Sequence, residues 1–202
     1  MIRAIFFDCF GVLTESIWKQ LLAGLTPEQA AEVTSLHRAY DKGFISYDEF
    51  KSEAGTVAHI AGERFDELFV THPGSHKNTE LLRYIAELSR HYKIGIISNV
   101  GSAWIRESFL TPTEQALFND MVLSFEVGMS KPDAEMFTVA AERLKVEPRE
   151  AVMIDDQEAY CQAATSVGMR AVVYTNFVQL RAELEALLAS ASDANDQSLA
   201  GT

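Results

Sequence analysis

The chain has 202 residues, of which 48% are hydrophobic and 23% are charged, with 11 Gly and 5 Pro. This composition is typical of a globular protein and excludes collagen-like, low-complexity and largely disordered chains. The 29 acidic residues outnumber the 17 Lys and Arg residues and give a net charge of −12, which argues against binding to nucleic acid or to an anionic membrane surface.

The first element that the sequence predicts is a short buried strand at residues 2–7, an apolar run too short for a signal peptide or a membrane span. Residues 14–74, by contrast, contain helix starts and no convincing strand. Thr26 and Gln29 have the spacing of a capping box, and residues 46–49 repeat that pattern. We therefore expect a small, all-helical cap over residues 14–74, inserted directly after the first strand.

Strands and helices alternate after this cap. Apolar runs of strand length recur at residues 94–97, 121–123, 151–154 and 171–174. Apolar residues at helical spacing accompany them at residues 81–88, 136–144 and 160–167. This alternation predicts an α/β fold, a three-layer, Rossmann-like core in which helices cover both faces of a parallel sheet.

These patterns also predict the domain boundaries. We assign residues 1–13 and 75–188 to the α/β core and residues 14–74 to the cap. Residues 189–202 are mainly Ser, Ala, Asp and Asn, with hardly a large apolar side chain, so we expect a disordered tail.

Polar side chains follow several of the predicted strands, at the edge of the sheet where ligands of open parallel sheets bind. They are Asp8, Ser98, Asn99, Asp155 and Asp156, together with Lys131, which stands just before a helix opened by Pro132. For any one of these positions taken alone, helix capping or a turn is the simpler explanation.

The combination of these residues points to phosphate chemistry. Asp8, Asp155 and Asp156 would converge at one edge, where carboxylates repel one another unless a cation lies among them, and oxygen ligands suit Mg²⁺. Ser98 and Lys131 would supply a hydroxyl donor and a positive charge for phosphoryl oxygens. A carboxylate beside such a clamp can attack phosphorus and form an acyl phosphate.

Four short motifs in this order resemble those of the haloacid dehalogenase (HAD) superfamily. They are Asp8 within Phe-Phe-Asp-Cys-Phe-Gly-Val-Leu, then Ser98-Asn99, then Lys131-Pro132, and finally Asp155-Asp156. The helical insert after the first motif resembles the small cap of the first subclass of that superfamily. The resemblance covers nearly the whole chain and implies the same core and cap.

The resemblance also implies roles for individual residues. Asp8 would be the nucleophile and a metal ligand. The main-chain carbonyl of Phe10 and the side chain of Asp155 would also bind Mg²⁺, with Asp156 close by. Ser98, Asn99 and Lys131 would surround the phosphoryl group.

The chain departs from the family pattern at Phe10, where phosphatases of this superfamily usually carry a second Asp that protonates the leaving group. A phenyl ring has no proton to give, and loss of a general acid typically costs about 10²- to 10⁴-fold in rate. Three interpretations remain open. The protein is a phosphatase for good leaving groups, such as sugar 1-phosphates or acyl phosphates; a 2-haloacid dehalogenase, a family with an aromatic residue at this position; or a regulatory protein that binds phosphate and magnesium with little or no turnover.

The predicted cap offers candidates for substrate recognition. Lys42 lies in a loop between two predicted cap helices, with Tyr40, Phe44 and Arg38 close to it in the sequence. Such a loop is where a lid would touch a substrate, although a solvated turn explains these residues equally well. Trp18 and Trp104 are candidates for the walls of a cleft. The five His residues have no metal-ligand spacing, and we interpret them as surface residues or local hydrogen-bond partners.

The function that the sequence favours is therefore an Mg²⁺-dependent phosphatase of a small phosphorylated metabolite, with neither nucleic acid nor membrane as partner. Cys9 and Cys161 are too few for a disulfide framework, so we expect a reducing, cytoplasmic location.

Overall fold

A computed structural model describes residues 1–16, 18–66 and 77–199 of the chain. Its core is a parallel sheet of five strands in the order β3-β2-β1-β4-β5. The strands are β1 (Ala4–Phe7), β2 (Lys93–Ser98), β3 (Asp120–Leu123), β4 (Ala151–Asp155) and β5 (Arg170–Val173). All five lie where the sequence predicts them, and the α/β, Rossmann-like fold is confirmed.

Helices cover both faces of this sheet. The remaining core elements are α5 (Thr79–Leu88), a π-helical turn at Ile105–Phe109, α6 (Pro112–Gln115), α7 (Ser124–Val127), α8 (Ala134–Arg143), a 3₁₀ turn at Pro148–Glu150, α9 (Glu158–Ser166) and α10 (Phe177–Leu199). Alternate residues of β1 show the layering. Ile5 and Phe7 belong to the cluster that contains residues of α5 and α10, whereas Ala4 and Phe6 belong to the cluster that contains residues of α8 and α9.

Between β1 and α5 the chain forms a separate group of helices. They are α1 (Trp18–Ala23), α2 (Pro27–Asp41), α3 (Tyr47–Ala58) and α4 (Gly62–Asp66), packed around their own apolar cluster that includes Val33, Phe50 and Phe65. The capping boxes expected at Thr26 and at Ser46 are both formed. We call residues 18–66 the helical insert; the predicted boundary at residue 74 lies outside the described residues.

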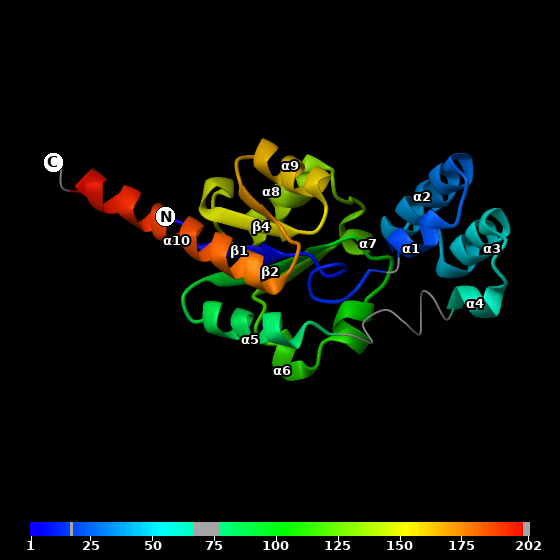
Figure 1. Cartoon of the computed structure of the whole chain (residues 1–202), viewed down its shortest axis with the longest axis horizontal. Helices are drawn as coiled ribbons and strands as arrows, with labels where there is room; N and C mark the ends of the chain where they lie inside the picture. Colours follow the sequence, from blue (N-terminus) through cyan, green and yellow to red (C-terminus); the bar gives the residue numbers. More distant parts are fainter. Residues whose placement is uncertain (17, 67–76, 200–202) are drawn as a thin grey trace.

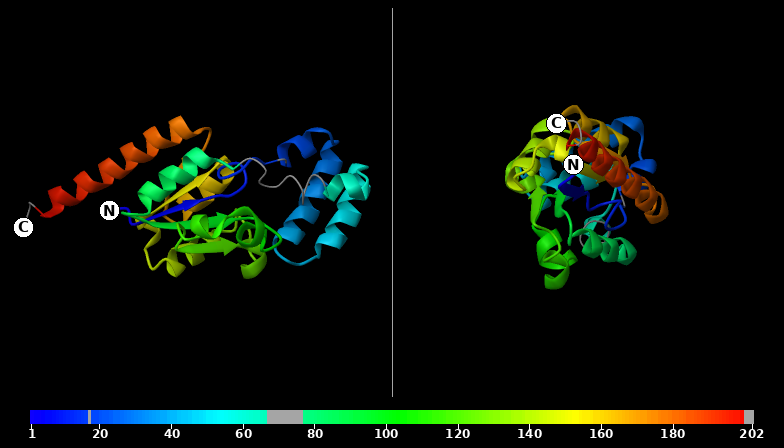
Figure 2. Two further views of the ribbon diagram at one scale, coloured as in Figure 1. Left: turned by 90° about the horizontal axis from the view of Figure 1, so that it is seen from below. Right: turned by 90° about the vertical axis from the view of Figure 1, so that its left-hand side faces the viewer.

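The insert and the C-terminal helix lie at opposite ends of the molecule. Figure 1 and Figure 2 show α1–α4 grouped at one end and α10 extending away at the other. The expectation of a disordered tail from residue 189 differs from the structure, in which α10 continues to Leu199. Residues 189–199 contain neither Gly nor Pro, and their alanines favour continuation of the helix. Residues 200–202 lie outside the described part of the chain.

The sheet order places a topological switch point between β1 and β4. From β1 the chain adds β2 and β3 on one side of the sheet, and it then returns to add β4 and β5 on the other. Ligands of such sheets bind at the carboxyl ends of the strands beside the switch point. Residues at the ends of β1 and β4 are therefore the first to consider as a site.

Candidate functional site

Three carboxylates meet at the ends of β1 and β4. Asp8 follows β1, Asp155 ends β4, and Asp156 follows it, and one oxygen from each lies within 4.8 Å of the other two. The two strands pair in parallel, with Phe7 opposite Ile154, so the register itself brings these side chains together. Oxygen donors grouped in this way fit a divalent cation such as Mg²⁺.

The loop after Asp8 approaches Asp156 so closely that only glycine fits. Gly11 has a φ of +91°, and a Cβ atom added there would lie 2.6 Å from the Asp156 Cγ. Both features favour glycine, because a larger residue would be strained and would displace the carboxylate. Gly11 thus lets the loop after β1 pack directly against the end of β4.

A buried lysine lies among the carboxylates. The Lys131 Nζ is 2.8 Å from Asp8 Oδ1 and 2.5 Å from Asp155 Oδ2, and the residue is 1% exposed. Burial works to lower the pKa of Lys131, but the two carboxylates outweigh it and raise that pKa, so the ammonium is charged. It also lies 5.0 Å from the centre of the Tyr160 ring. Lys131 therefore holds Asp8 and Asp155 in place by charge.

Burial controls the protonation of Asp8. Together with the negative charge of Asp155, it raises the pKa of Asp8 to about 7, against the opposing effect of Lys131. Asp8 Oδ1 also accepts a hydrogen bond of 2.7 Å from the main-chain N–H of Cys9. Cys9 itself is fully buried, and burial raises the pKa of its thiol, as expected for a packing residue rather than a reactive one.

The two polar residues after β2 have different environments. The Asn99 amide nitrogen donates to the Lys131 carbonyl at 2.9 Å, and the Asn99 amide oxygen accepts from the Lys131 main-chain N–H at 2.8 Å. Both ends of the amide thus position Lys131, and Asn99 also lines the cavity beside Asp8, so its place around a phosphoryl group stays a prediction. The Ser98 Oγ is fully buried and has no hydrogen-bond partner among the described residues. A buried hydroxyl without a partner is costly, and a bound oxyanion would satisfy it.

Phe10 stands at the position where phosphatases of the resembling superfamily usually carry a second Asp. The Phe10 ring stacks on Trp104, with ring centres 5.7 Å apart, and Trp104 in turn stacks on Phe109. Phe10 is therefore built into the packing of the site, and the proton donor that the resemblance leads one to expect is absent from this position.

A cavity of about 420 Å³ opens beside Asp8 and Lys131, between the core and the insert. Aromatic and polar side chains line it together; both tryptophan candidates contribute, as do Tyr40 and Tyr160. Arg38, one of the two candidates for substrate recognition, also lines it. The volume suits a small metabolite.

The other candidate, Lys42, points elsewhere. It is not among the residues that line the cavity, and its Nζ lies 2.7 Å from Asp133 Oδ2. Lys42 is the C-terminal cap of α2, and the turn there directs its side chain to the start of α8. Lys42 therefore joins the insert to the core, a role that its place beside a loop did not reveal.

Two cavity residues were missed by the sequence interpretation. His37 stacks on Trp18 with ring centres 4.0 Å apart, and its Nδ1 lies 3.4 Å from the buried Asp41 Oδ2. Of the two interpretations given for the histidines, His37 fits the local polar partner, and burial lowers its pKa to about 4. The spacing of His37 and Asp41, four residues apart on a predicted helix, was the available signal.

A family model described as haloacid dehalogenase-like hydrolase matches residues 2–168. The chain belongs to this family.

Curated relatives of this HAD-like hydrolase match part of its length. It is 35% identical over 82 residues to acyl-CoA dehydrogenase family member 10 of Mus musculus, a match that covers 41% of the chain and 8% of the mouse protein. It is 26% identical over 108 residues to a phosphorylated carbohydrates phosphatase of Thermotoga maritima, which covers 54% of the chain and 48% of that protein. The chain thus spans less than half the length of each relative.

Solved structures share the fold more completely. A HAD-like family hydrolase from Porphyromonas gingivalis has a TM-score of 0.72 at 20% identity, covering 93% of this chain and 98% of that one. A HAD family enzyme from Bacteroides thetaiotaomicron, in complex with magnesium and inorganic phosphate, has a TM-score of 0.67 at 21% identity, covering 87% and 95%. A 2-haloacid dehalogenase from Pseudomonas syringae pv. Tomato DC3000 has a TM-score of 0.58 at 21% identity, covering 86% of each chain. At these identities the likeness shows the fold.

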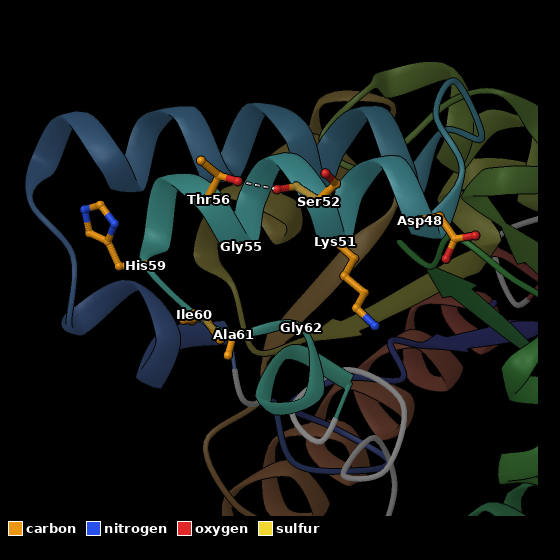
Figure 3. A pocket seen from close by; sticks show the side chains of 9 residues that line it. All are labelled: Asp48, Lys51, Ser52, Gly55, Thr56, His59, Ile60, Ala61 and Gly62. Atoms are coloured by element: carbon orange, nitrogen blue, oxygen red, sulfur yellow. Dashed lines mark hydrogen bonds between the residues drawn. The ribbon is translucent and has the colours of Figure 1, made fainter.

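The HAD-like hydrolase has a second hollow, on the insert. Figure 3 shows it between α3 and α4, where Asp48, Lys51 and Ser52 are among the residues that line it. Lys51 binds Asp66, and the carboxylate cluster of the core is not part of this hollow. The cavity beside Asp8 and Lys131 is therefore the candidate active site. Within the described ranges, no helix combines the length and the apolar character needed to cross a membrane.

Proposed function

We propose that this HAD-like hydrolase is an Mg²⁺-dependent phosphatase of a small phosphorylated metabolite, such as a sugar 1-phosphate or an acyl phosphate. The observation that carries the proposal is the placement of Asp8. Its carboxylate is 2.8 Å from the Lys131 ammonium and faces a cavity large enough for such a substrate. A carboxylate beside a fixed positive charge has the arrangement needed to attack phosphorus.

The residues of the cluster fit Mg²⁺. Asp8, Asp155 and Asp156 would hold it, and the family resemblance adds the Phe10 carbonyl as a further ligand. The bound ion would neutralise charge on the phosphoryl oxygens and orient them for attack. The three carboxylates carry more negative charge than Lys131 alone can balance, which supports a cation at this position.

The chain's own groups define the reaction. An Asp8 oxygen attacks phosphorus while the bond to the leaving oxygen breaks, and the electron pair of that bond goes to the leaving oxygen. Lys131 and the Ser98 hydroxyl would donate hydrogen bonds to the phosphoryl oxygens. Water then attacks the phosphorus of the phosphoaspartate. The bond between the Asp8 oxygen and phosphorus breaks, and its electron pair returns to the Asp8 carboxylate.

One of the relatives and the cavity walls support a carbohydrate substrate. The Thermotoga maritima relative is named for phosphorylated carbohydrates. The rings of Trp18, Tyr40 and Trp104 line the cavity here, and flat apolar surfaces with a few polar groups suit the faces of a sugar ring. Arg38 would bind a polar or anionic group at the far end of the substrate.

Phe10 favours a second candidate, a protein that binds phosphate and Mg²⁺ for regulation and turns over little. The resemblance and the cluster are the same in both cases, and only turnover separates them. A dehalogenase, the third interpretation, would need no cation. The carboxylate cluster, which suits a cation, therefore does not favour it.

A substrate panel tests the proposal. The purified protein would be assayed with Mg²⁺ against sugar 1-phosphates, acetyl phosphate, alkyl phosphates and 2-haloacids, with Asp8→Asn as the inactive variant. Asp48→Asn is the matched control, because Asp48 is exposed on the insert, outside the cavity. We expect phosphate release that requires both Mg²⁺ and Asp8. Binding of Mg²⁺ without any release would favour the regulatory protein, and halide release without metal would favour the dehalogenase.

A further inference from the structure

The site described above contains no proton donor at Phe10, so the other groups that line the cavity are of interest. Asp41, the last residue of α2, is one of them, and its side chain is 5% exposed. It comes from the insert and reaches the same cavity as Asp8 and Lys131. The cavity therefore has a carboxyl group from the insert as well as the carboxyl group of Asp8 from the core.

Hydrogen bonds to the core fix the end of α2 that carries Asp41. The Ser124 Oγ donates to the Asp41 carbonyl at 2.5 Å and accepts from the Val100 main-chain N–H at 2.8 Å. Ser124 is fully buried. Asp41 is therefore held against the core and is not carried on a loose loop, as a group that transfers protons requires.

The surroundings of Asp41 keep its carboxyl group protonated near neutral pH. Burial and the negative charge of Asp8 together raise the pKa of Asp41 to about 8, against the opposing effect of Lys131. The ionisable groups that face it come from four elements: His37 and Tyr40 of α2, Asp8 after β1, Lys131 before α8, and Tyr160 of α9. A carboxyl group of this kind can donate a proton and later accept one at working pH.

The other groups in the cavity suit proton transfer less well. Burial lowers the pKa of His37 to about 4, so its ring is neutral near neutral pH and does not act as an imidazolium acid. Burial raises the pKa of Tyr160 above that of a free phenol, and Lys131 is held by two carboxylates. Glu15 lines the cavity but is exposed to solvent.

We propose that Asp41 is the general acid and base of the hydrolysis, supplied by the insert in place of the acid that Phe10 lacks. This inference rests on the proposed phosphatase function and widens its substrate class to ordinary phosphomonoesters with alcohol leaving groups. Such leaving groups need a proton, whereas an acyl phosphate does not.

The proton moves in two steps. As the bond between phosphorus and the leaving oxygen breaks, its electron pair goes to that oxygen, and the Asp41 carboxyl gives its proton to the same atom. The product leaves as an alcohol and Asp41 becomes a carboxylate. In the second step Asp41 takes a proton from the attacking water, the bond between phosphorus and Asp8 breaks, and Asp8 is restored as a carboxylate.

The experiment compares Asp41→Asn with the unchanged enzyme on two substrates, acetyl phosphate and an alkyl phosphate. We expect the variant to lose about 10²- to 10⁴-fold in kcat on the alkyl phosphate and less than about tenfold on acetyl phosphate. In the unchanged enzyme, kcat on the alkyl phosphate should fall as pH rises through the pKa of Asp41, and this fall should be absent in the variant. Asp48→Asn, the same change at an exposed position of the insert, should behave like the unchanged enzyme.

The outcomes separate this inference from the proposed function. Acetyl phosphate turnover by Asp41→Asn shows that the variant is folded and that Asp8 works. An equal loss of kcat on both substrates, or a fall of kcat with rising pH that persists in the variant, would overturn the role of Asp41. Neither result would contradict the phosphatase function. No phosphate release by the unchanged enzyme from either substrate would overturn the phosphatase function and the role of Asp41 with it.

Discussion

At the scale of single residues, the site depends on one buried cation among carboxylates. Lys131 is close to both Asp8 and Asp155, and all three are buried. Removing one partner of such a group leaves uncompensated charge in a poorly solvated place, which is far more costly than the loss of a surface ion pair. Lys131 therefore supports the stability of the core as well as the chemistry.

We predict that Lys131→Met lowers the free energy of unfolding by about 3–5 kcal/mol at pH 8, the range found when one partner of a buried pair is removed. Added Mg²⁺ should stabilise this variant more than the unchanged protein. Without the Lys131 ammonium the Asp8 and Asp155 carboxylates repel each other, and a bound cation would neutralise that repulsion. Urea unfolding with and without Mg²⁺ measures both effects. Equal stability of the two proteins would contradict the role given to Lys131.

Asp41 gives a prediction with the opposite sign. The carboxyl is buried with its pKa raised from 3.8 to about 8, so between these values the unfolded chain is ionised while the folded chain still holds the proton. The contribution of Asp41 to stability is thus fully present below about pH 4 and is lost as pH rises toward 8. Asp41→Asn should therefore have a higher Tm than the unchanged protein at pH 8. At pH 4 the two proteins should have nearly the same Tm. A difference in Tm that is independent of pH would contradict the burial of an ionisable group at this position.

At the scale of elements, the contact between α2 and the loop after β2 forms one wall of the cavity. A Cβ atom added at Gly101 would lie 2.4 Å from the Tyr40 ring. That ring is itself stacked on Phe50 at 5.1 Å, within the apolar cluster of the insert, so it cannot move alone. The insert and the core are fitted to each other at this point.

We predict that Gly101→Ala displaces the end of α2 and raises KM, with a fall in kcat, while the core remains folded. Steady-state kinetics on the best substrate of the panel, with circular dichroism to follow folding, checks this. Gly24→Ala is the control, because a Cβ there meets only the Leu21 carbonyl oxygen at an ordinary 3.7 Å. Unchanged kinetics in Gly101→Ala would mean that the position of α2 does not matter to the reaction.

Particular residues show how far the sequence predicts this fold and site. The five strands are predictable because each is an apolar run bounded by polar residues, and the carboxyl ends of parallel strands meet at one edge, where Asp8 and Asp155 were expected. Their close approach follows from the pairing of β1 with β4. The contacts of Lys42, Asn99 and Asp41 are not predictable in this way. They depend on how the insert docks on the core and on local turns, which no periodicity encodes.

At the scale of the whole molecule, the sheet and the helical insert contribute different parts of the site. The sheet brings the carboxylates and Lys131 to one edge, and the insert closes the cavity above them with aromatic side chains, His37 and Asp41. The overall charge of −12 includes three carboxylates that a cation would hold together, two of which also contact Lys131. The acidity of the chain is thus partly concentrated in the site.

The most direct test of the proposed function is the capture of the phosphoaspartate. The protein would be mixed with acetyl phosphate and Mg²⁺, quenched in acid within the first turnover, and digested for mass spectrometry of the peptide that contains Asp8. We predict one phosphoryl group on Asp8 and none on the same peptide of Asp8→Asn. Phosphate release in the first turnover without any label on Asp8 would contradict it.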